Sequence, residues 1–153
     1  MPHSIDTSAV LDGWIRYYPP DLFPSFWSRF DELISGGETF FSMQVVVELE
    51  QQDDGAAKWL QNHGDALIEI DDDVFARAKG IDEQFPGWVT KKQNGADPFV
   101  IGLAEQKDLQ VITGERLSGA TNPKRMRIPD VCKARGVVCG SLTDLIREQG
   151  WSF

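Results

Sequence analysis

The stretch "NGADPFVIGLAEQKDLQVIT", residues 94–113, decides the fold class of this chain. Apolar residues recur at helical spacing after Asp97 and Pro98, which predicts a helix over residues 96–107. A short apolar run follows almost at once, which predicts a strand over residues 109–113. A helix that leads directly into a strand is the unit from which α/β proteins are built.

The same alternation continues in both directions along the chain. Further short strands are predicted at residues 3–6, 38–42, 66–70 and 136–140. Helices are predicted at residues 26–35, 43–52, 54–63, 71–85, 131–135 and 141–150. No repeat, linker or low-complexity segment interrupts this pattern. The sequence therefore predicts a single α/β domain over residues 1–153, with a mostly parallel sheet of about five strands between helices.

Several classes of protein are disfavoured by the composition. No apolar run approaches the roughly 20 residues that a membrane-spanning helix needs, so no membrane association is expected. The start "MPHSIDTSAVLDGW" has neither a basic segment nor a long apolar segment, so no signal peptide is expected. Cys132 and Cys139 form neither a C-x-x-C pair nor a disulfide framework. We expect two reduced, buried thiols in a cytoplasmic protein.

The chain is acidic, with a formal net charge of −9. A dedicated nucleic-acid-binding domain is usually basic, so the overall charge weakens that interpretation without excluding a basic groove. Clustered carboxylates repel one another unless a bound divalent cation or a basic partner offsets their charge. Solvated acidic surface explains most of the excess.

Four acidic residues from distant parts of the chain are placed to meet at one edge of the sheet. Asp6 lies at the carboxyl end of the first strand, and Glu115 follows the fourth. Glu48 lies in the helix after the second strand, and Asp97 opens the helix before the fourth. Ligands of parallel sheets bind beyond the carboxyl ends of the strands, near the point where the strand order reverses. The four carboxylates are therefore candidates for one shared site.

Each of these acids also has an ordinary structural explanation. Asp97 before Pro98 fits a helix N-cap, although Asn94 is a competing cap that would leave the Asp97 side chain free in the first turn. Asp6 fits an Asx turn, Glu48 a solvated helix position and Glu115 a loop surface.

Carboxylates are hard oxygen ligands, and three or four of them suit Mg²⁺ or Mn²⁺. No Cys/His spacing indicates zinc, and the isolated His3 and His63 are expected to be surface or structural histidines. No P-loop, G-x-G-x-x-G or G-x-S-x-G motif is present. An aspartyl-phosphate phosphatase would carry a second Asp where this chain has Ser8, which disfavours that class.

The segments "IDTSA", "VVVELE", "NGADPFVIGLA" and "VITGE", in this order, resemble a PIN domain, the metal-dependent nuclease fold of the VapC-type toxins. The chain is most similar to a PIN-like family catalogued as a domain of unknown function. That closer resemblance covers nearly the whole chain, and it includes "WIRYYPPDLFPSFW", "IPDVC" and the terminal "REQGWSF".

The resemblance implies a three-layer fold with the strand order 3-2-1-4-5 and a metal site built from four acids. Asp6 matches the first metal-binding Asp, Glu48 the Glu of the x-E-L motif, and Asp97 the third acid. Glu115 stands where many PIN domains have the Asp of a T-x-D motif, so binding of a second metal is open.

Four further residues are expected to support this site. Ser8 would support the water shell of the metal, and Thr113 the loop geometry. Asn94 is expected to cap the helix that contains Asp97. Asp130 could add a fifth carboxylate, but we favour a cap for a helix that begins at Val131.

Weaker features concern the substrate. Lys91 and Lys92 precede the Asp97 segment, and Lys124, Arg125 and Arg127 precede Asp130. These basic groups could hold phosphates, or they are ordinary solvated loop charges. Aromatic residues could stack on bases or belong to the core or a subunit interface: Trp14, Tyr17, Tyr18 and Trp88.

The family resemblance implies a Mg²⁺- or Mn²⁺-dependent endoribonuclease that hydrolyses phosphodiester bonds with a metal-activated water. It further implies the toxin of a toxin–antitoxin pair, a homodimer, an RNA substrate and a cognate antitoxin protein. The alternatives are a PIN-like interaction module with weak or no catalysis and a structure-specific DNA nuclease.

Overall fold

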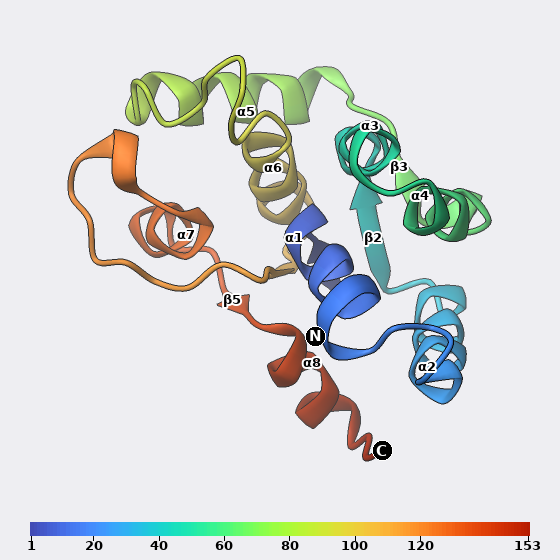
Figure 1. The fold of residues 1–153 in the computed structure, drawn as a ribbon. Coiled ribbons are helices and arrows are strands. Elements are labelled where there is room, and N and C mark those ends of the chain that lie inside the picture. The colour runs from blue at the N-terminus through green and yellow to red at the C-terminus, as the bar shows by residue number, and fades with distance from the viewer.

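A five-stranded parallel sheet forms the centre of the molecule (Figure 1), and the computed structural model describes all 153 residues. The strands are β1 (His3–Ile5), β2 (Thr39–Ser42), β3 (Leu67–Ile68), β4 (Gln110–Ile112) and β5 (Cys139–Gly140). Their order is β3-β2-β1-β4-β5, and every neighbouring pair is parallel. This confirms the expected fold class and strand order. The order reverses between β1 and β4, where Ile5 pairs with Ile112.

Helices flank this sheet. The α-helices are α1 (Thr7–Leu11), α2 (Pro24–Ser35), α3 (Met43–Gln52), α4 (Asp54–Gln61), α5 (Asp72–Gln84), α6 (Asp97–Lys107), α7 (Ile128–Arg135) and α8 (Leu142–Gln149). A π-helix, η1 (Asp12–Tyr17), continues α1, and two 3₁₀ turns are η2 (Gly64–Ala66) and η3 (Pro123–Arg125). None of these helices is long and apolar enough to span a membrane.

The apolar faces of the helices and the strands share one core. β1, β2 and β4 all contact α6, and α3 contacts β2, α1 and α6. The core contains fully buried residues from β1, β2 and β4, such as Ile5, Phe41 and Ile112. Burial on this scale fixes where each strand ends, because a strand shifted by one residue would turn its apolar side chains to the wrong face.

Most predicted elements are found close to their expected positions, and three differ. The strands at 66–70 and 136–140 are only two residues long, because β3 and β5 are edge strands with a single partner each. The helix expected from Val131 begins at Ile128, since Pro129 is tolerated in a first turn. The π-helix at residues 12–17 was not predicted.

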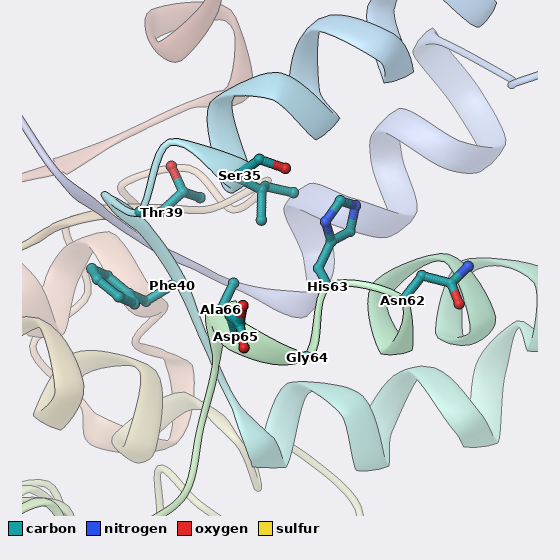
Figure 2. Close-up of a pocket in the computed structure, with 10 residues that line it drawn as sticks. Ser35, Thr39, Phe40, Asn62, His63, Gly64, Asp65 and Ala66 are labelled. Carbon is teal, nitrogen blue, oxygen red and sulfur yellow. The ribbon is translucent and has the colours of Figure 1, made fainter.

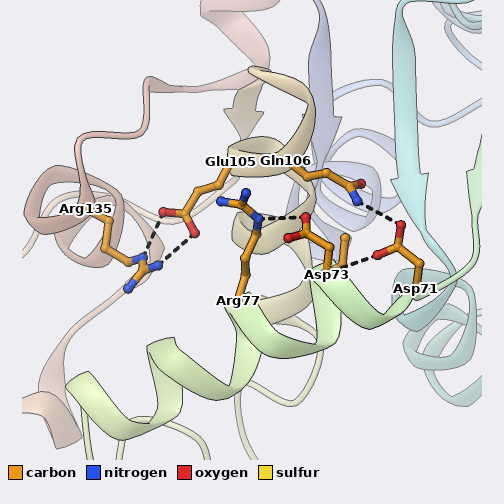
Figure 3. Close-up of polar contacts among 7 residues, drawn as sticks. Asp71, Asp73, Arg77, Glu105, Gln106 and Arg135 are labelled. Carbon is orange, nitrogen blue, oxygen red and sulfur yellow. Dashed lines mark hydrogen bonds and ion pairs between the residues drawn. The ribbon is translucent and has the colours of Figure 1, made fainter.

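Polar contacts tie α5, α6 and α7 together (Figure 3). Arg135 of α7 holds Glu105 of α6 with two bonds, Nε to Oε2 at 3.1 Å and Nη2 to Oε1 at 2.9 Å. Asp71 caps α5 by accepting the Val74 N–H at 2.8 Å, and it also accepts a bond from Gln106 at 2.8 Å. The prediction that residues 71–73 mark a helix start is therefore confirmed.

Both cysteines are free, as predicted. Cys132 is buried in α7, and Cys139 is half-buried in β5. His3 is buried in β1 and contacts Thr39 and Glu148, and His63 contacts Asp31 at 2.8 Å. Both histidines are thus structural, as expected.

Candidate metal centre

A polar depression of about 180 Å³ lies at the carboxyl edge of the sheet, beside the ends of β1 and β4. All four acids that the sequence singles out line this depression. Its lining residues are Asp6, Thr7, Ser8, Leu11, Glu48, Gln52, Asn94, Asp97 and Glu115. Only one of them is hydrophobic, so the depression is an oxygen-rich site and not an apolar binding pocket.

Asp6 is held by two hydroxyl groups from different parts of the chain. The Thr113 Oγ1 and Ser8 Oγ hydroxyls both donate to Asp6 Oδ2, the former at 2.9 Å. Ser8 Oγ also accepts the Gly114 N–H at 2.9 Å. The loop after β4 is therefore fastened to the turn after β1, which fixes the orientation of the Asp6 carboxylate. Ser8 was expected to support the water shell of a metal, and in the structure it holds Asp6. Thr113 was expected to support the loop geometry, and its Oγ1 accepts the Glu115 N–H at 3.1 Å.

Gly114 leaves little room for a side chain. A Cβ atom there would meet the Asp12 carboxylate and lie 3.1 Å from the Ser8 carbonyl oxygen. A methyl group at this position would make the Asp12 side chain turn away and the Ser8 carbonyl move by a few tenths of an ångström. This packing keeps the loop after β4 next to the end of β1.

Glu115 points from this loop toward both the acid cluster and α7. Its Oε2 accepts the Ile128 N–H, the first of α7, at 2.9 Å. A carboxylate is favoured at a helix N-terminus because the first N–H groups lack helical partners. One oxygen of Glu115 thus positions the side chain, and the other has no hydrogen bond from the protein.

Glu48 faces the site and not the solvent. It is half-buried, and its Oε1 accepts a hydrogen bond from Thr7 Oγ1 at 2.8 Å. Thr7 is a site residue that sequence reasoning missed. Its position directly after Asp6, at the start of α1, was the available signal, because a first-turn side chain there can face the neighbouring helix α3.

Asp97 is the first residue of α6 and does not cap it. The N–H groups that an Asp97 cap would bind, those of Phe99 and Val100, donate instead to the Ala96 carbonyl at 3.0 and 3.1 Å. The Asp97 side chain lines the acid cluster together with Asp6. The cap interpretation of Asp97 is therefore wrong, and its carboxylate lies free in the first turn.

The expected role of Asn94 is also wrong. The N-cap of α6 is Ala96, and Asn94 adopts a left-handed conformation with a φ of 65°. Its side-chain amide donates to the Trp88 carbonyl at 2.8 Å, while its own carbonyl accepts the Asp97 N–H at 3.2 Å. Asn94 is suited to this turn because asparagine tolerates the left-handed region better than most residues. It stabilises the loop that delivers Asp97 to the site.

Asp130 does not join the acid cluster. It lies in the first turn of α7 and accepts the Arg127 N–H at 2.8 Å. It also accepts bonds from Ser118 and from the Gly119 N–H, so it anchors the loop that precedes α7. Asp130 therefore caps α7, as we favoured. The helix begins at Ile128 and not at Val131, so Asp130 acts from the third helical position and not from the N-cap position. Asp130 does not line the depression that the other four acids share.

The acid cluster disfavours its own ionisation. Burial, together with the charges of Asp6, Glu115 and Glu48, raises the pKa of Asp97 to about 9. Burial also raises the pKa of each of the other three carboxyls, against the opposing effect of their hydrogen bonds. Asp97 therefore carries a proton at neutral pH unless a positive charge enters the depression.

The residues present fit a hard divalent cation. Only carboxylate, hydroxyl and amide side chains offer donor atoms in the depression, and no histidine or cysteine lines it. In the present side-chain positions, no three acidic, histidine or cysteine groups are close enough to hold one ion together. The carboxylate side chains would therefore have to rotate for three of them to close on one cation. Such an ion would relieve the repulsion that raises the carboxyl pKa values.

A family model described as "Domain of unknown function (DUF4411)" matches residues 3–153. The chain belongs to this family. The expected membership of a family catalogued as a domain of unknown function is thus confirmed. A search of curated proteins finds no match to the chain.

The basic residues of this DUF4411 protein lie on two loops that pack together. The Trp88 indole N–H donates to the Met126 carbonyl at 3.0 Å, and the Lys124 side chain lies over Gly87. The first loop continues through Asn94 into the acid cluster, and the second leads into α7, whose first N–H binds Glu115. The expected nucleic-acid-binding residues are all exposed and outside the ion pairs of the structure: Lys91, Lys92, Lys124, Arg125 and Arg127.

A more voluminous cavity than the acid depression lies elsewhere. It has a volume of about 540 Å³ and is lined by residues such as Ser35, Thr39 and His63 (Figure 2). Thr39 begins β2, so this cavity lies at the amino edge of the sheet, opposite the acid cluster. The convergence of carboxyls with raised pKa values, and not cavity volume, is the reason for taking the acid cluster as the candidate site.

Proposed function

We propose that this DUF4411 protein is a Mg²⁺- or Mn²⁺-dependent endoribonuclease of the PIN class. The single observation that carries the proposal is the convergence of Asp6, Glu48, Asp97 and Glu115 on one oxygen-rich depression at the switch point of a parallel sheet. This is the place and the ligand set that the resemblance to PIN domains implies. The chemistry that a bound divalent cation supplies is polarisation of a phosphoryl oxygen and activation of a water molecule at neutral pH.

The protein residues have distinct tasks in this scheme. Ser8 and Thr113 hold Asp6, and Thr7 holds Glu48, so that two carboxylates are pre-oriented. Asp97 carries a proton in the cation-free protein and releases it when positive charge enters the depression, because its pKa of about 9 depends on burial and on the neighbouring negative charges.

Substrate binding rests on the two basic loops. Lys91 and Lys92 lie on the loop that leads into Asn94 and Asp97, and Lys124, Arg125 and Arg127 lie on or next to the loop that packs against it. Exposed cations on two adjacent loops beside an acidic site attract a phosphate backbone and offset the overall negative charge locally. This arrangement supports a nucleic-acid substrate.

The cellular role that we propose follows from the resemblance to VapC-type toxins. The protein would be the toxin of a toxin–antitoxin pair, act as a homodimer in the cytoplasm and be blocked by a cognate antitoxin protein.

One observation favours a second candidate function, an interaction module without catalysis. One oxygen of Glu115 already accepts the first N–H of α7, and no three carboxylates are in position to hold an ion. A calorimetric titration separates the two candidates: a folded protein that fails to bind Mn²⁺ at millimolar concentration is the module.

The decisive test of activity is cleavage of a labelled RNA in the presence of Mn²⁺, with EDTA as the blank and Asp97→Asn as the variant. Asp21→Asn is the matched control, because it makes the same substitution at an exposed loop residue. We expect cleavage by the wild type and by the Asp21 variant, and at least a hundredfold loss in the Asp97 variant. Equal Mn²⁺-dependent cleavage by wild type and Asp97→Asn would refute the role of Asp97. DNA of the same sequence, single-stranded and as a flap, tests whether the substrate is DNA.

A further inference from the structure

A second pocket adjoins the acid cluster and has no part in the scheme above. It has a volume of about 290 Å³, close to the lower limit of typical small-molecule sites. It shares Glu115 with the acid depression, and Thr113 and Gly114 form the wall between the two. We call it the side pocket; its residues are Ala9, Asp12, Tyr17, Tyr18, Thr113, Gly114, Glu115, Arg116, Ser141, Leu142 and Thr143.

Tyr17 is the unusual residue of the side pocket. Its side chain is 56% exposed, and no other aromatic ring lies against it. Tyr18, by contrast, stacks on Phe26 with ring centroids 4.4 Å apart. Trp88 is 1% exposed, and Trp14 packs on Trp27 at 4.9 Å. Of the four aromatic residues that the sequence offers for base stacking, only Tyr17 thus keeps a free ring face.

The π-helix explains how Tyr17 reaches the pocket. The Tyr18 N–H donates to the Gly13 carbonyl at 2.8 Å, the five-residue bond that defines a π-turn. In an α-helix, residues five apart would point roughly 140° from each other. The wider π-turn reduces this angle, and Asp12 and Tyr17 both line the side pocket. A departure from α-helical geometry at this place is typical of functional sites.

The rest of the lining supplies polar partners for a nucleotide. Arg116 is exposed and outside the ion pairs of the structure, so its guanidinium can bind a phosphate. Asp12 offers a carboxylate that can accept from the exocyclic amino group of a base. Leu142 and Ala9 give the pocket an apolar floor.

We propose that the side pocket binds one unpaired nucleotide of single-stranded RNA next to the phosphate that is cleaved. The base stacks on Tyr17, and the adjoining phosphate is held by Arg116. This inference rests on the proposed nuclease function, because the acid cluster defines where the cleaved phosphate lies. It implies that the enzyme acts on single-stranded segments, since a base-paired nucleotide cannot enter the pocket.

The test is binding of a fluorescein-labelled, 12-nucleotide single-stranded RNA of mixed sequence, measured by fluorescence anisotropy in EDTA, where no cleavage occurs. We expect Tyr17→Ala and Tyr17→Leu to weaken binding roughly tenfold or more, because stacking on an aromatic ring is lost. Tyr17→Phe keeps the ring and should bind like the wild type. Phe75→Ala is the matched control, since Phe75 is similarly exposed on α5, at 59%, outside the side pocket. Arg116→Ala should make the slope of log affinity against log salt concentration shallower, by the amount expected for the loss of about one phosphate contact.

Each outcome has a defined meaning. Binding by Tyr17→Ala within twofold of wild type, or no binding by the wild type, overturns the side-pocket assignment. A parallel cleavage assay with Mn²⁺ separates this result from the nuclease proposal. If the wild type cleaves RNA and the Tyr17→Ala variant binds RNA as tightly as the wild type, the nuclease proposal stands and the side-pocket assignment is wrong. Tyr17-dependent binding without cleavage leaves the subsite standing without the nuclease function.

Discussion

Replacement of Asp97 by Asn should make the cation-free protein more stable at neutral pH. Asp97 is 6% exposed, and its pKa is raised from 3.8 to about 9 by burial and by three neighbouring carboxyls. The folded protein therefore binds a proton that the unfolded chain releases above pH 4. Below pH 4 the Asp97 carboxyl is protonated in both states and does not lower the free energy of unfolding. As the pH rises from 4 toward 9, only the unfolded chain loses this proton, so the free energy of unfolding decreases.

The magnitude follows from the distance between the pH and the ordinary pKa. About three pH units separate pH 7 from 3.8, and each unit corresponds to about 1.4 kcal/mol, so Asp97 lowers the free energy of unfolding by up to about 4 kcal/mol at pH 7. Asn has nearly the same shape and does not ionise. The variant should match the wild type near pH 4 and exceed it increasingly up to pH 9.

Urea unfolding in EDTA at pH 5, 6, 7 and 8, followed by circular dichroism, measures this difference. The Asp21→Asn variant controls for loss of a carboxylate at an exposed position and should follow the wild type at every pH. An Asp97→Asn protein that is less stable than the wild type at pH 8 would refute the reasoning. A stability difference that does not change with pH would refute it equally.

Three further substitutions test other parts of the structure. Thr7→Val removes the hydrogen bond to Glu48 and should weaken Mn²⁺ binding, measured by calorimetry, roughly fivefold. Thr7→Ser keeps the hydroxyl group and should bind Mn²⁺ like the wild type. Unchanged Mn²⁺ affinity in Thr7→Val would contradict the positioning role of Thr7. Gly114→Ala places a Cβ against the Asp12 carboxylate and should lower the free energy of unfolding by about 2 kcal/mol; a neutral effect in urea would show that the loops are not closely packed. Arg135→Ala breaks the two-bond ion pair between α7 and α6 and should cost about 2 kcal/mol by the same method, with Arg135→Lys recovering only part of it; full recovery by lysine would contradict the two-bond geometry.

The fold was predictable because its elements carry their own signals. The helix over α6 and the strand β4 follow from the apolar pattern of residues 94–113 alone. The strand order came from the family resemblance and not from the hydrophobic pattern. The pattern around one strand does not show which distant strand pairs with it. The short β3 and β5 were overestimated, since an edge strand ends where its single neighbour ends.

The four acids were predicted correctly as neighbours, but their supporting contacts were not. A residue such as Thr7 or Asn94 is assigned a role by the side chain that it faces, and that depends on how two distant elements pack. The expected Asn94 cap failed because the turn before α6 places Asn94 in the left-handed region and directs its amide to Trp88. The π-helix was missed because one additional residue per turn leaves no clear sign in a hydrophobic pattern.

Calorimetric titration of Mn²⁺ into the folded protein at pH 7.5 tests the central claim, that the four carboxylates form a divalent-cation site, most directly. We predict that the wild type and Asp21→Asn bind Mn²⁺, and that Asp97→Asn binds at least tenfold more weakly. Because the pKa of Asp97 is about 9, binding to the wild type should also release close to one proton, seen as a dependence of the measured heat on the ionisation enthalpy of the buffer. Equal Mn²⁺ affinity of the wild type and Asp97→Asn, or no Mn²⁺ binding by the folded wild type, would contradict this account.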